Sequence, residues 1–544
     1  MTEPGPQSSN AKHKATFLFS ADGPLKALKP DYRLRPEQAA MAEAVEAGLL
    51  SGGTTLVEAG TGVGKSLAYL IPAAAWALSQ DKRVIVSTYT KALQEQLMQQ
   101  ELPLVQKLFR SMNMELRFSL LMGSENYLCL QRLHRCLEDK DNLLQGPEDR
   151  KTLEALWEWS AGAQTGQRGH LVSMVHDELW SHICRDADIC LGSRGIFSEK
   201  CLWRKDSERA KKAHILVVNH ALLLAGPHKW LPHDAIILDE AHNLEEAASQ
   251  NLGGTISAFR VQKLLDELYN AKTSRGILVR LKALDPTVKG ILRGLIATAH
   301  KANEAFFAKA RTKFSLAAGF KVASGSNARR IQEPNSVEDC LSPALDPIIK
   351  ELVSTVVPHS ASKEDEELAT SAAKKLRAVM ADLRQFVECS DHQLAFWAEL
   401  RITRRGPSLE LKMAPIHVGE LLKERLFVEG ARRILTSATL STGKSFDIFQ
   451  ERLGITKCTT TLVESPFDYS ERVRLLIPPE LPDPQGSQEE SLNSIVGFCE
   501  RLSEIVPGGI FVLFTSWKML HQAALRLKDH LPGREVMAQG DGRP

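Results

Sequence analysis

Two short polar segments, each directly after an apolar run, constrain the fold of this chain most strongly. The first is Ala59-Gly60-Thr61-Gly62-Val63-Gly64-Lys65-Ser66, and the second is Asp239-Glu240-Ala241-His242. Glycines let backbone N–H groups curl around phosphates, a lysine reaches the β- and γ-phosphates, and a serine hydroxyl holds Mg²⁺. An acidic pair at the end of a buried strand suits the same metal and the attacking water. Together the segments predict a site that binds and hydrolyses a nucleoside triphosphate.

The residues of these segments have distinct expected roles. Lys65 is expected to contact the phosphates, and Ser66 to hold Mg²⁺. Asp239 is expected to hold the same ion, and Glu240 to orient or deprotonate the water. A chance glycine turn and a pair of solvated loop acids are the alternatives, and the apolar strand pattern before each segment argues against both. The other expected nucleotide contacts are Arg35, Gln38, Gly60, Thr61, Gly62, Gly64 and His242.

Gln38 lies about one helix before the phosphate loop, in the segment Arg35-Pro36-Glu37-Gln38. A glutamine amide donates and accepts hydrogen bonds, so it can pair with both edges of an adenine. A surface helix with proline near its first turn explains the same residues. The position ahead of the loop favours adenine recognition.

Length and composition exclude several classes of function. A chain of 544 residues exceeds one compact core and predicts several domains. Its net charge of +2 indicates no basic domain, so any nucleic-acid groove must be locally basic. No apolar run approaches the ~20 residues of a membrane span, and residues 1–15 lack the apolar core of a secretory signal. We therefore expect a cytoplasmic protein with no membrane role and a disordered tail at residues 1–16.

The order of strand and helix patterns predicts an α/β fold. In residues 54–125, apolar strands alternate with helices: strands at 54–57, 83–87 and 119–122, helices at 67–79 and 91–100. This rhythm predicts a parallel sheet that binds its ligand at the carboxyl ends of the strands. Further strands are expected at 214–218, 235–238, 433–436 and 509–514. Two insertions interrupt the pattern, one at 126–212 with five of the nine cysteines and a mostly helical one at 255–400.

A family resemblance rests on the order of motifs along the chain. The motifs are the segments described above together with Ser87-Thr88, Asn219-His220 and Ser437-Ala438-Thr439. In this order the chain closely resembles the superfamily 2 DNA helicases of the DinG and XPD type, from about residue 17 to the end. Segments typical of that branch are Gly123-Ser124-Glu125-Asn126-Tyr127-Leu128-Cys129, Val217-Val218-Asn219-His220-Ala221-Leu222-Leu223 and Ser465-Pro466-Phe467.

The resemblance implies an ATP-dependent 5′-to-3′ DNA helicase or translocase with two RecA-like P-loop motor domains. ATP would bind between these domains, and single-stranded or forked duplex DNA would pass beneath a helical arch. Hydroxyls and backbone amides suit contact with the DNA phosphates. The implied phosphate contacts are Ser87, Thr88 and Lys91 in the first motor domain, and Thr515 and Ser516 in the second. Partners from a repair or CRISPR complex would fit the same resemblance.

The resemblance also divides the chain into parts. The first motor domain would cover 17–125, 213–254 and a return and crossover at 411–476. The parts between and after would be an iron–sulfur-type insertion at 126–212, the helical arch at 255–410 and an incomplete second motor domain at 477–544.

Four cysteines hold a [4Fe–4S] cluster in the family that the chain resembles. Cys129 matches the first ligand, and Cys190 and Cys201 match two of the later three, but Gly195 stands where the middle cysteine is usual. Cubane clusters normally take four thiolates, and Cys184 would supply the fourth if its loop folds back. The alternative is a domain that folds by packing alone, with Cys184 and Cys136 as ordinary buried thiols. Both interpretations stay open.

The resemblance further implies elements after residue 544, among them an arginine on the γ-phosphate that is worth roughly 10³ to 10⁵ in rate. The segment Gln539-Gly540-Asp541-Gly542-Arg543 lies too close to Ser516 to be that motif. The chain is therefore expected to bind ATP and to hydrolyse it poorly on its own. Two hypotheses follow: a DinG-type helicase, or an ATP- and nucleic-acid-binding accessory subunit with weak or no motor activity.

Overall fold

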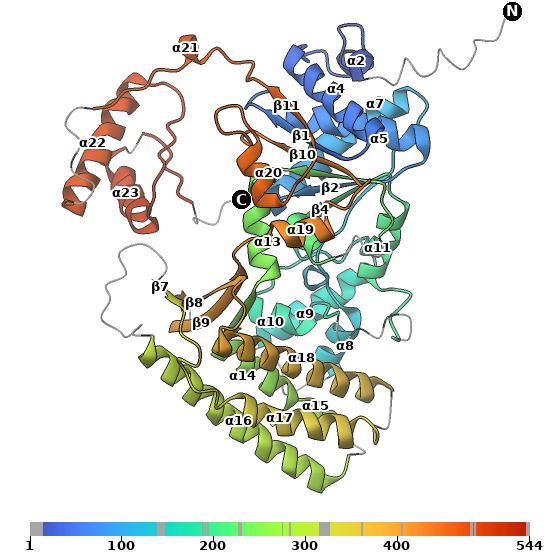
Figure 1. Ribbon diagram of the computed structural model, residues 1–544, viewed down its shortest axis with the longest axis vertical. Helices are drawn as coiled ribbons and strands as arrows, with labels where there is room; N and C mark the ends of the chain where they lie inside the picture. The colour runs from blue at the N-terminus through green and yellow to red at the C-terminus, as the bar shows by residue number, and fades with distance from the viewer. Residues whose placement is uncertain are drawn as a thin grey trace, which may run out of the picture. The chain divides into compact units, whose positions relative to one another are not determined.

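The computed structural model describes most of the chain (Figure 1). The described residues are 15–138, 147–187, 190, 192, 195–226, 231–274, 276–281, 284–314, 327–360, 363–403, 406–478, 482, 486–531 and 533–539. They form two units, the first comprising Met1–Ser315 and Arg329–Phe467, and the second Leu316–Ala328 and Asp468–Pro544. No helix in the described ranges is long and apolar enough to cross a membrane.

A seven-stranded sheet organises the first unit, with the strand order β11-β1-β10-β5-β2-β4-β3. All of its neighbouring strands pair in parallel. The strands are β1 (Thr54–Ala59), β2 (Val84–Thr88), β3 (Phe118–Leu120), β4 (Ile215–Asn219), β5 (Ala235–Asp239), β10 (Arg432–Ser437) and β11 (Thr459–Val463). Central strands that are covered on both faces tend to appear in a sequence as apolar runs, which is why most strands of this sheet could be predicted. The structure thus confirms the predicted α/β fold with a parallel sheet.

Helices cover both faces of this sheet. Successive strand side chains point to opposite faces, so Val57 and Leu56 of β1 belong to different cores. The Val57 core includes α4 (Pro36–Ser51), α5 (Lys65–Gln80) and α7 (Leu102–Ser111). On the Leu56 face lie α12 (His220–Leu224), α13 (Leu244–Leu252), α19 (Gly419–Arg425) and α20 (Asp447–Leu453). This packing holds the strand ends rigidly in place.

The described residues between β3 and β4 form a helical insertion. Its helices are α8 (Leu130–Glu138), α9 (Pro147–Ser160), α10 (Asp177–Ile183) and α11 (Leu202–Lys212). They enclose an apolar core of their own, in which Leu133, Leu156 and Ile183 are fully buried. Packing therefore accounts for much of the order of this insertion.

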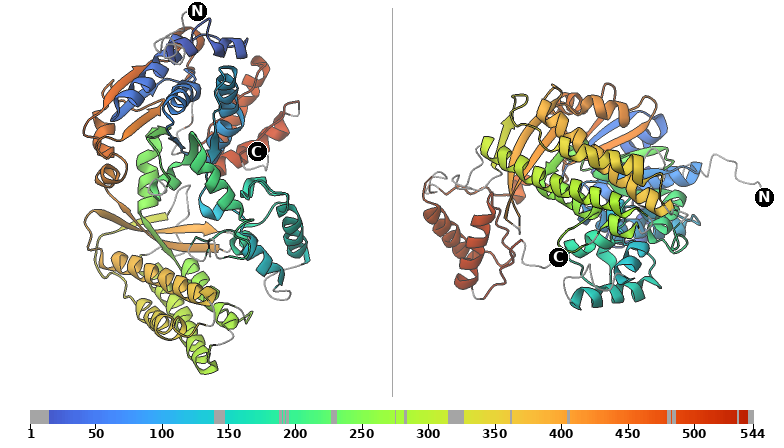
Figure 2. Two further views of the ribbon diagram at one scale, coloured as in Figure 1. Left: turned by 90° about the vertical axis from the view of Figure 1, so that its right-hand side faces the viewer. Right: turned by 90° about the horizontal axis from the view of Figure 1, so that it is seen from below.

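The segment between β5 and β10 contains more strand than the sequence pattern predicted. Its helices are α14 (Ala258–Leu268), α15 (Ile277–Arg280), α16 (Pro286–Lys313), α17 (Ser342–Glu351) and α18 (Lys363–Glu388). A four-stranded sheet of order β6-β9-β8-β7 accompanies them, with β6 (Gly254–Ser257), β7 (Asn327–Ile331), β8 (Leu394–Thr403) and β9 (Gly406–Pro415). The antiparallel β8–β9 hairpin lies between the parallel sheet and these helices (Figure 2). The helical periodicity predicted up to residue 400 was thus wrong for residues 394–400, which belong to β8.

The second unit contains two main helices, α22 (Gln488–Ile505) and α23 (Trp517–His530), packed through Val496, Cys499 and Leu527. A short helix, α21 (Tyr469–Arg472), precedes them. The strand predicted at 509–514 is wrong, because the described residues there pair with no neighbour and leave Phe511 89% and Leu513 81% exposed. A strand needs a second strand for its backbone hydrogen bonds, and an apolar sequence alone cannot supply it.

Candidate nucleotide-binding site

The strand order brings three predicted segments to one edge of the parallel sheet. Strand β10 lies between β1 and β5, so residues 59–66, 239–242 and 437–439 all begin at neighbouring carboxyl ends. Within this register Glu58 faces Ser437, and Thr436 faces Asp239. Ligands of parallel α/β sheets bind at this edge.

The phosphate loop between β1 and α5 is held through its carbonyl groups. Gly62 and Gly64 adopt the left-handed φ of 85° that glycine favours. A Cβ at Gly62 would collide with the Phe467 ring, and one at Gly64 with the Gln38 amide. Three side chains donate hydrogen bonds to loop carbonyls: Ser465 to Thr61 at 2.8 Å, Arg35 to Gly62 at 2.5 Å and Gln38 to Gly64 at 2.9 Å. Because carbonyls and amides of a turn point apart, this arrangement leaves loop amides and the α5 N-terminus for an anion.

Gln38 is 3% exposed, and both ends of its amide are engaged. Its Nε2 donates to the Gly64 carbonyl, while its Oε1 accepts from the Tyr32 hydroxyl at 2.7 Å. The sequence pattern did not indicate that Gln38 and Arg35 support the loop. Adenine recognition by Gln38 stays a prediction.

Asp239 lies buried at the end of β5, beside residues of the phosphate loop. Its Oδ2 accepts a hydrogen bond from the Tyr69 hydroxyl at 2.9 Å, and its Oδ1 accepts one from the Glu240 N–H at 3.0 Å. Burial and the Glu240 charge raise the pKa of Asp239 to about 6, against the opposing effects of these donors and of Lys65. The Ser66 side chain lies close enough to the Tyr69 hydroxyl to lower its pKa slightly against the effects of burial and Asp239. Lys65, Ser66 and Asp239 therefore lie near one another at this edge of the sheet.

Tyr69 connects the two motifs, and sequence reasoning missed it. The residue is fully buried in α5, and burial together with Asp239 raises the pKa of its hydroxyl well above the usual value. The hydroxyl therefore stays protonated and remains a donor to the carboxylate. The sequence did contain a signal for this contact, a tyrosine in an otherwise apolar helix, because a buried hydroxyl needs a hydrogen-bond partner.

His242 joins Glu240 to the third segment. Its Nδ1 lies 2.6 Å from the Ser437 Oγ and 3.3 Å from the Glu240 Oε2. Sequence reasoning also missed Glu58, whose carboxylate accepts hydrogen bonds from the N–H groups of Leu440 and Ser441 and from the Ser441 hydroxyl. The loop after β10 is thereby fixed to β1, with Ser437 in reach of His242.

Among the predicted DNA contacts, Ser87, Thr88 and Lys91 lie at or just after the carboxyl end of β2 but differ in exposure. The side chains of Ser87 and Thr88, at the end of β2, are fully buried, whereas Lys91 is exposed and its Nζ donates to the Asn126 Oδ1 at 2.9 Å. In the second unit the Ser516 Oγ accepts from the Met519 N–H and caps α23, directly after Thr515. Nucleic-acid contact at these five residues stays a prediction.

The four candidate cluster cysteines are only partly assembled. Leu128 forms a backbone bridge with Cys184, and the Cys129 N–H donates to the Ile183 carbonyl at 2.8 Å. Burial raises the pKa of the Cys129 thiol, and Cys190 lies near enough to raise it further. Cys201 precedes α11. Within the described ranges, however, no three His, Cys, Asp or Glu side chains are grouped to hold a metal ion, so the described donors do not form a four-thiolate site.

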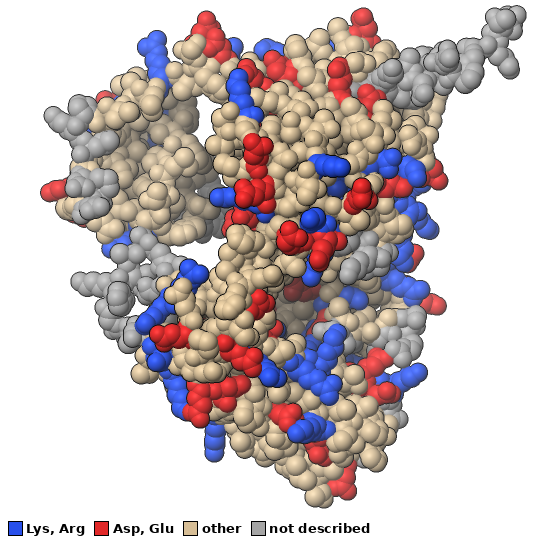
Figure 3. Space-filling view, viewed as in Figure 1, with Lys and Arg blue, Asp and Glu red and all other residues tan. Residues whose placement is uncertain are grey.

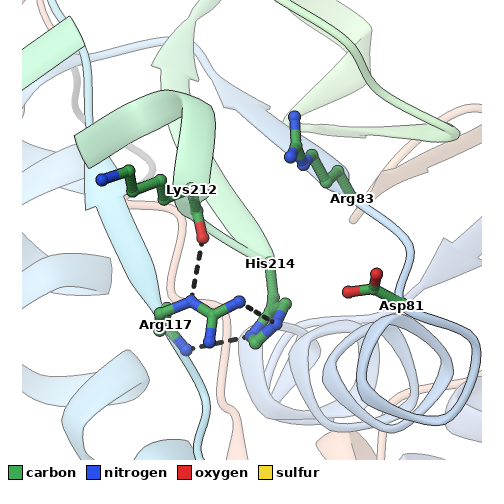
Figure 4. Close-up of a pocket in the computed structure, with 5 residues that line it drawn as sticks. All are labelled: Asp81, Arg83, Arg117, Lys212 and His214. Carbon is green, nitrogen blue, oxygen red and sulfur yellow. Dashed lines mark hydrogen bonds between the residues drawn. The ribbon is translucent and has the colours of Figure 1, made fainter. Parts of the chain in front are cut away.

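A cavity of about 450 Å³ lies at the opposite edge of the sheet. It is lined by Asp81, Arg83, Arg117, Lys212 and His214 (Figure 4). These residues precede β2, β3 and β4, at the amino ends of the strands. The cavity is therefore separate from the nucleotide site. Elsewhere, the face in Figure 3 intersperses acidic and basic side chains, in keeping with the small net charge.

Comparisons with known proteins agree with this geometry. Residues 35–154 match the family model "DEAD/DEAH box helicase". The chain is 31% identical to ATP-dependent DNA helicase YoaA of Escherichia coli (strain K12) over 535 residues, which cover 96% of this chain and 78% of that protein. It is 29% identical to ATP-dependent helicase DinG of Mycobacterium tuberculosis (strain ATCC 25177 / H37Ra), over 93% of this chain and 75% of that protein. A solved structure titled "Truncated XPD" aligns at 13% identity over 77% of this chain and 98% of that one, with a TM-score of 0.37, too low to compare the folds.

Proposed function

The chain belongs to the family of ATP-dependent DNA helicases that includes DinG and YoaA, and we propose that it couples ATP hydrolysis to 5′-to-3′ movement on single-stranded DNA. The observation that carries the proposal is the hydrogen bond from Tyr69 to Asp239, because Tyr69 lies in the helix that follows the phosphate loop and so joins that loop to the acidic pair. Single-stranded or forked duplex DNA is the proposed substrate, and the cytoplasm the proposed location.

The proposed chemistry assigns one task to each group. Lys65 and the loop amides bind the β- and γ-phosphates, and Ser66 and Asp239 would hold Mg²⁺. The donor set fits this ion, since Mg²⁺ in such sites needs only one or two carboxylates beside the substrate phosphates. When bound, Mg²⁺ neutralises charge that develops on the phosphate oxygens. Glu240 orients the attacking water, and the contact from His242 fixes the Glu240 carboxylate.

The parts outside the site have proposed roles as well. We assign DNA phosphates to the backbone of Ser87 and Thr88, to the Lys91 ammonium and to the helix start at Thr515 and Ser516. The helices α14 to α18 would form the arch. A [4Fe–4S] cluster stays a prediction, and no step above depends on it.

The test compares Lys65→Ala with Lys350→Ala, a matched lysine variant on the exposed side of α17. Without the Lys65 ammonium we expect DNA-stimulated ATPase to be lost and binding of a fluorescent single-stranded oligonucleotide to persist, while Lys350→Ala keeps both. Unchanged turnover in Lys65→Ala would overturn the proposed site. A wild-type protein that binds ATP and DNA without DNA-stimulated turnover would instead support the accessory-subunit hypothesis.

A further inference from the structure

The cavity at the amino ends of the strands has a basic lining that the chemistry above does not use. Asp81 and Arg83 lie between α5 and β2, and Arg117 directly precedes β3. Lys212 ends α11, and His214 directly precedes β4 (Figure 4). Three cations and one carboxylate line this cavity, so it keeps an excess of two positive charges in a chain whose net charge is only +2.

The nearest acid on the neighbouring strand does not neutralise these cations. Both oxygens of Asp234 are engaged, one by the Lys82 Nζ at 3.0 Å and the other by the Arg83 backbone N–H at 2.9 Å. Within the described residues, the Arg83 guanidinium and the Lys212 ammonium have neither a hydrogen bond nor an ion pair. Their charges are therefore available to a ligand in the cavity.

His214 supplies a second and independent observation. The residue is 7% exposed, and its Nδ1 accepts a hydrogen bond from the Arg117 backbone N–H at 3.1 Å. That N–H is fixed in place, because the Arg117 carbonyl accepts from the N–H groups of His214 and Ile215. A ring whose Nδ1 accepts carries its proton at Nε2. The Nε2 lies 2.9 Å from the Arg117 Nη2, which can only donate, so two N–H donors face each other.

Helix ends account for only part of this arrangement. Basic side chains near the carboxyl end of a helix offset its dipole, and α5 and α11 end at this cavity. The effect explains Lys212 and the hydrogen bond from the Arg117 Nε to the Lys212 carbonyl at 3.0 Å. It does not explain the facing donors, because a ring N–H and a guanidinium N–H repel each other whether or not a helix end is near. An oxygen atom that accepts from both would remove this conflict.

We propose that this cavity binds a terminal phosphate group, carried either by a small molecule or by the 5′ end of a DNA strand. One phosphate oxygen would accept from the His214 Nε2–H and the Arg117 Nη2, while Arg83 and Lys212 attract the other oxygens. A terminal phosphate carries about −1.5 to −2 charges at pH 7, which matches the excess positive charge of the lining. The volume of about 450 Å³ accommodates such a group. The inference goes beyond the proposed function, because the cavity lies at the sheet edge opposite the nucleotide site.

The first measurement is a calorimetric titration of inorganic phosphate into the full chain. The protein carries Lys65→Ala to weaken phosphate binding at the nucleotide site, and sodium chloride keeps the ionic strength constant, since salt screens exposed charges. We expect one saturable site with a dissociation constant of about 1 mM or less.

Two arginine variants in the same background locate that site. Loss of one charged donor should weaken phosphate binding about tenfold or more in Arg83→Met and in Arg117→Met. Arg311→Met, on the exposed side of α16, is the matched control and should bind phosphate unchanged. Thermal melting reports whether each variant folds. Arg83→Met is the decisive variant, because the guanidinium that it removes has no partner among the described residues.

The second measurement identifies the source of the phosphate. It compares single-stranded oligonucleotides of one sequence that end in a 5′-phosphate or a 5′-hydroxyl. If the ligand is a DNA end, the 5′-phosphate should raise the affinity about tenfold or more, and Arg83→Met should remove this difference. If the ligand is a small molecule, both oligonucleotides should bind alike while inorganic phosphate still binds in the cavity.

The absence of saturable phosphate binding, together with equal affinities for the two oligonucleotides, would overturn the inference. Phosphate binding that is unchanged in folded Arg83→Met or in folded Arg117→Met would overturn it as well, because the phosphate would then bind elsewhere. DNA-stimulated ATPase of the wild type reports on the helicase assignment alone, so the two results remain distinguishable.

Discussion

Replacement of Gln38 by leucine tests whether this residue supports the phosphate loop. The substitution keeps the approximate volume and removes the amide. It leaves the hydroxyl of Tyr32, a residue that is 8% exposed, without its hydrogen-bond partner. It also removes one of the two donors to the Gly64 carbonyl, which keeps its hydrogen bond from the Ala68 N–H at 3.3 Å. A stranded buried hydroxyl costs about 1–3 kcal/mol, and a carbonyl that keeps one bond loses about 1 kcal/mol or less. We therefore expect Gln38→Leu to lower the free energy of unfolding by about 2–3 kcal/mol.

A double-mutant cycle with Tyr32→Phe identifies the source of that loss. The double variant has no stranded hydroxyl. Its loss of unfolding free energy should therefore be smaller than the sum of the losses in the two single variants, by about 1–2 kcal/mol. Urea unfolding followed by circular dichroism measures all four proteins. Single costs that add within about 0.3–0.5 kcal/mol would refute the hydrogen-bond network.

Nucleotide affinity distinguishes loop support from adenine recognition. If Gln38 holds the loop, Gln38→Leu weakens ADP and GDP binding by the same factor, which we expect to be roughly tenfold, or about 1.4 kcal/mol. If Gln38 pairs with adenine, only the preference for ADP over GDP falls. Titration with fluorescent derivatives of both nucleotides measures the two constants. A selective loss for ADP would contradict loop support and favour the adenine prediction.

Three further predictions concern neighbouring groups. Tyr69→Phe removes a hydrogen-bond donor to a charged acceptor, and such a bond is worth about 1.5–3 kcal/mol. The affinity for ADP should therefore fall about tenfold or more in the presence of Mg²⁺ and stay unchanged in EDTA. An equal loss of ADP affinity with Mg²⁺ and with EDTA would argue against a role in metal binding. His242→Ala should reduce ATP turnover much more than nucleotide affinity, because it removes the contacts with Glu240 and Ser437 and leaves the phosphate loop intact, and a matching loss of affinity would disprove this. If Cys129, Cys184, Cys190 and Cys201 hold a [4Fe–4S] cluster, anaerobically purified protein should be brown and contain iron that is lost in Cys184→Ser and kept in Cys136→Ser, whose thiol belongs to the packed core of the insertion; a colourless protein without iron would contradict the predicted cluster.

The sequence predicted the strands that build the site because these are buried on both faces. Strands β1, β5 and β10 are buried along most of their length around short apolar stretches, and each is followed at once by its motif. The hairpin β8–β9 was missed although its residues alternate, with Phe396, Ala398, Leu409 and Leu411 buried, because the preceding helical periodicity was extended over it. Periodicity describes local structure, and partners distant in sequence decide whether a strand forms.

The contacts inside the site were less predictable than its location. Motif order places Lys65 and Asp239 at one sheet edge, but only packing brings the Tyr69 hydroxyl to the carboxylate or the Gln38 amide to the loop. Likewise, His242 lies in a recognisable motif, while its partner Ser437 lies 195 residues away and becomes adjacent only because β10 inserts beside β5. Such contacts depend on the strand order, which short motifs do not encode.

The location of a bound divalent ion tests the central claim most directly. Crystals of the protein grown with ADP and Mn²⁺ in place of Mg²⁺ would show the ion by its anomalous scattering. We expect one peak at about 2.0–2.2 Å from the Ser66 Oγ, with the Asp239 carboxylate bound directly or through one water and the phosphates against Lys65. A manganese ion bound elsewhere, with Asp239 turned away from the phosphate loop, would contradict the account.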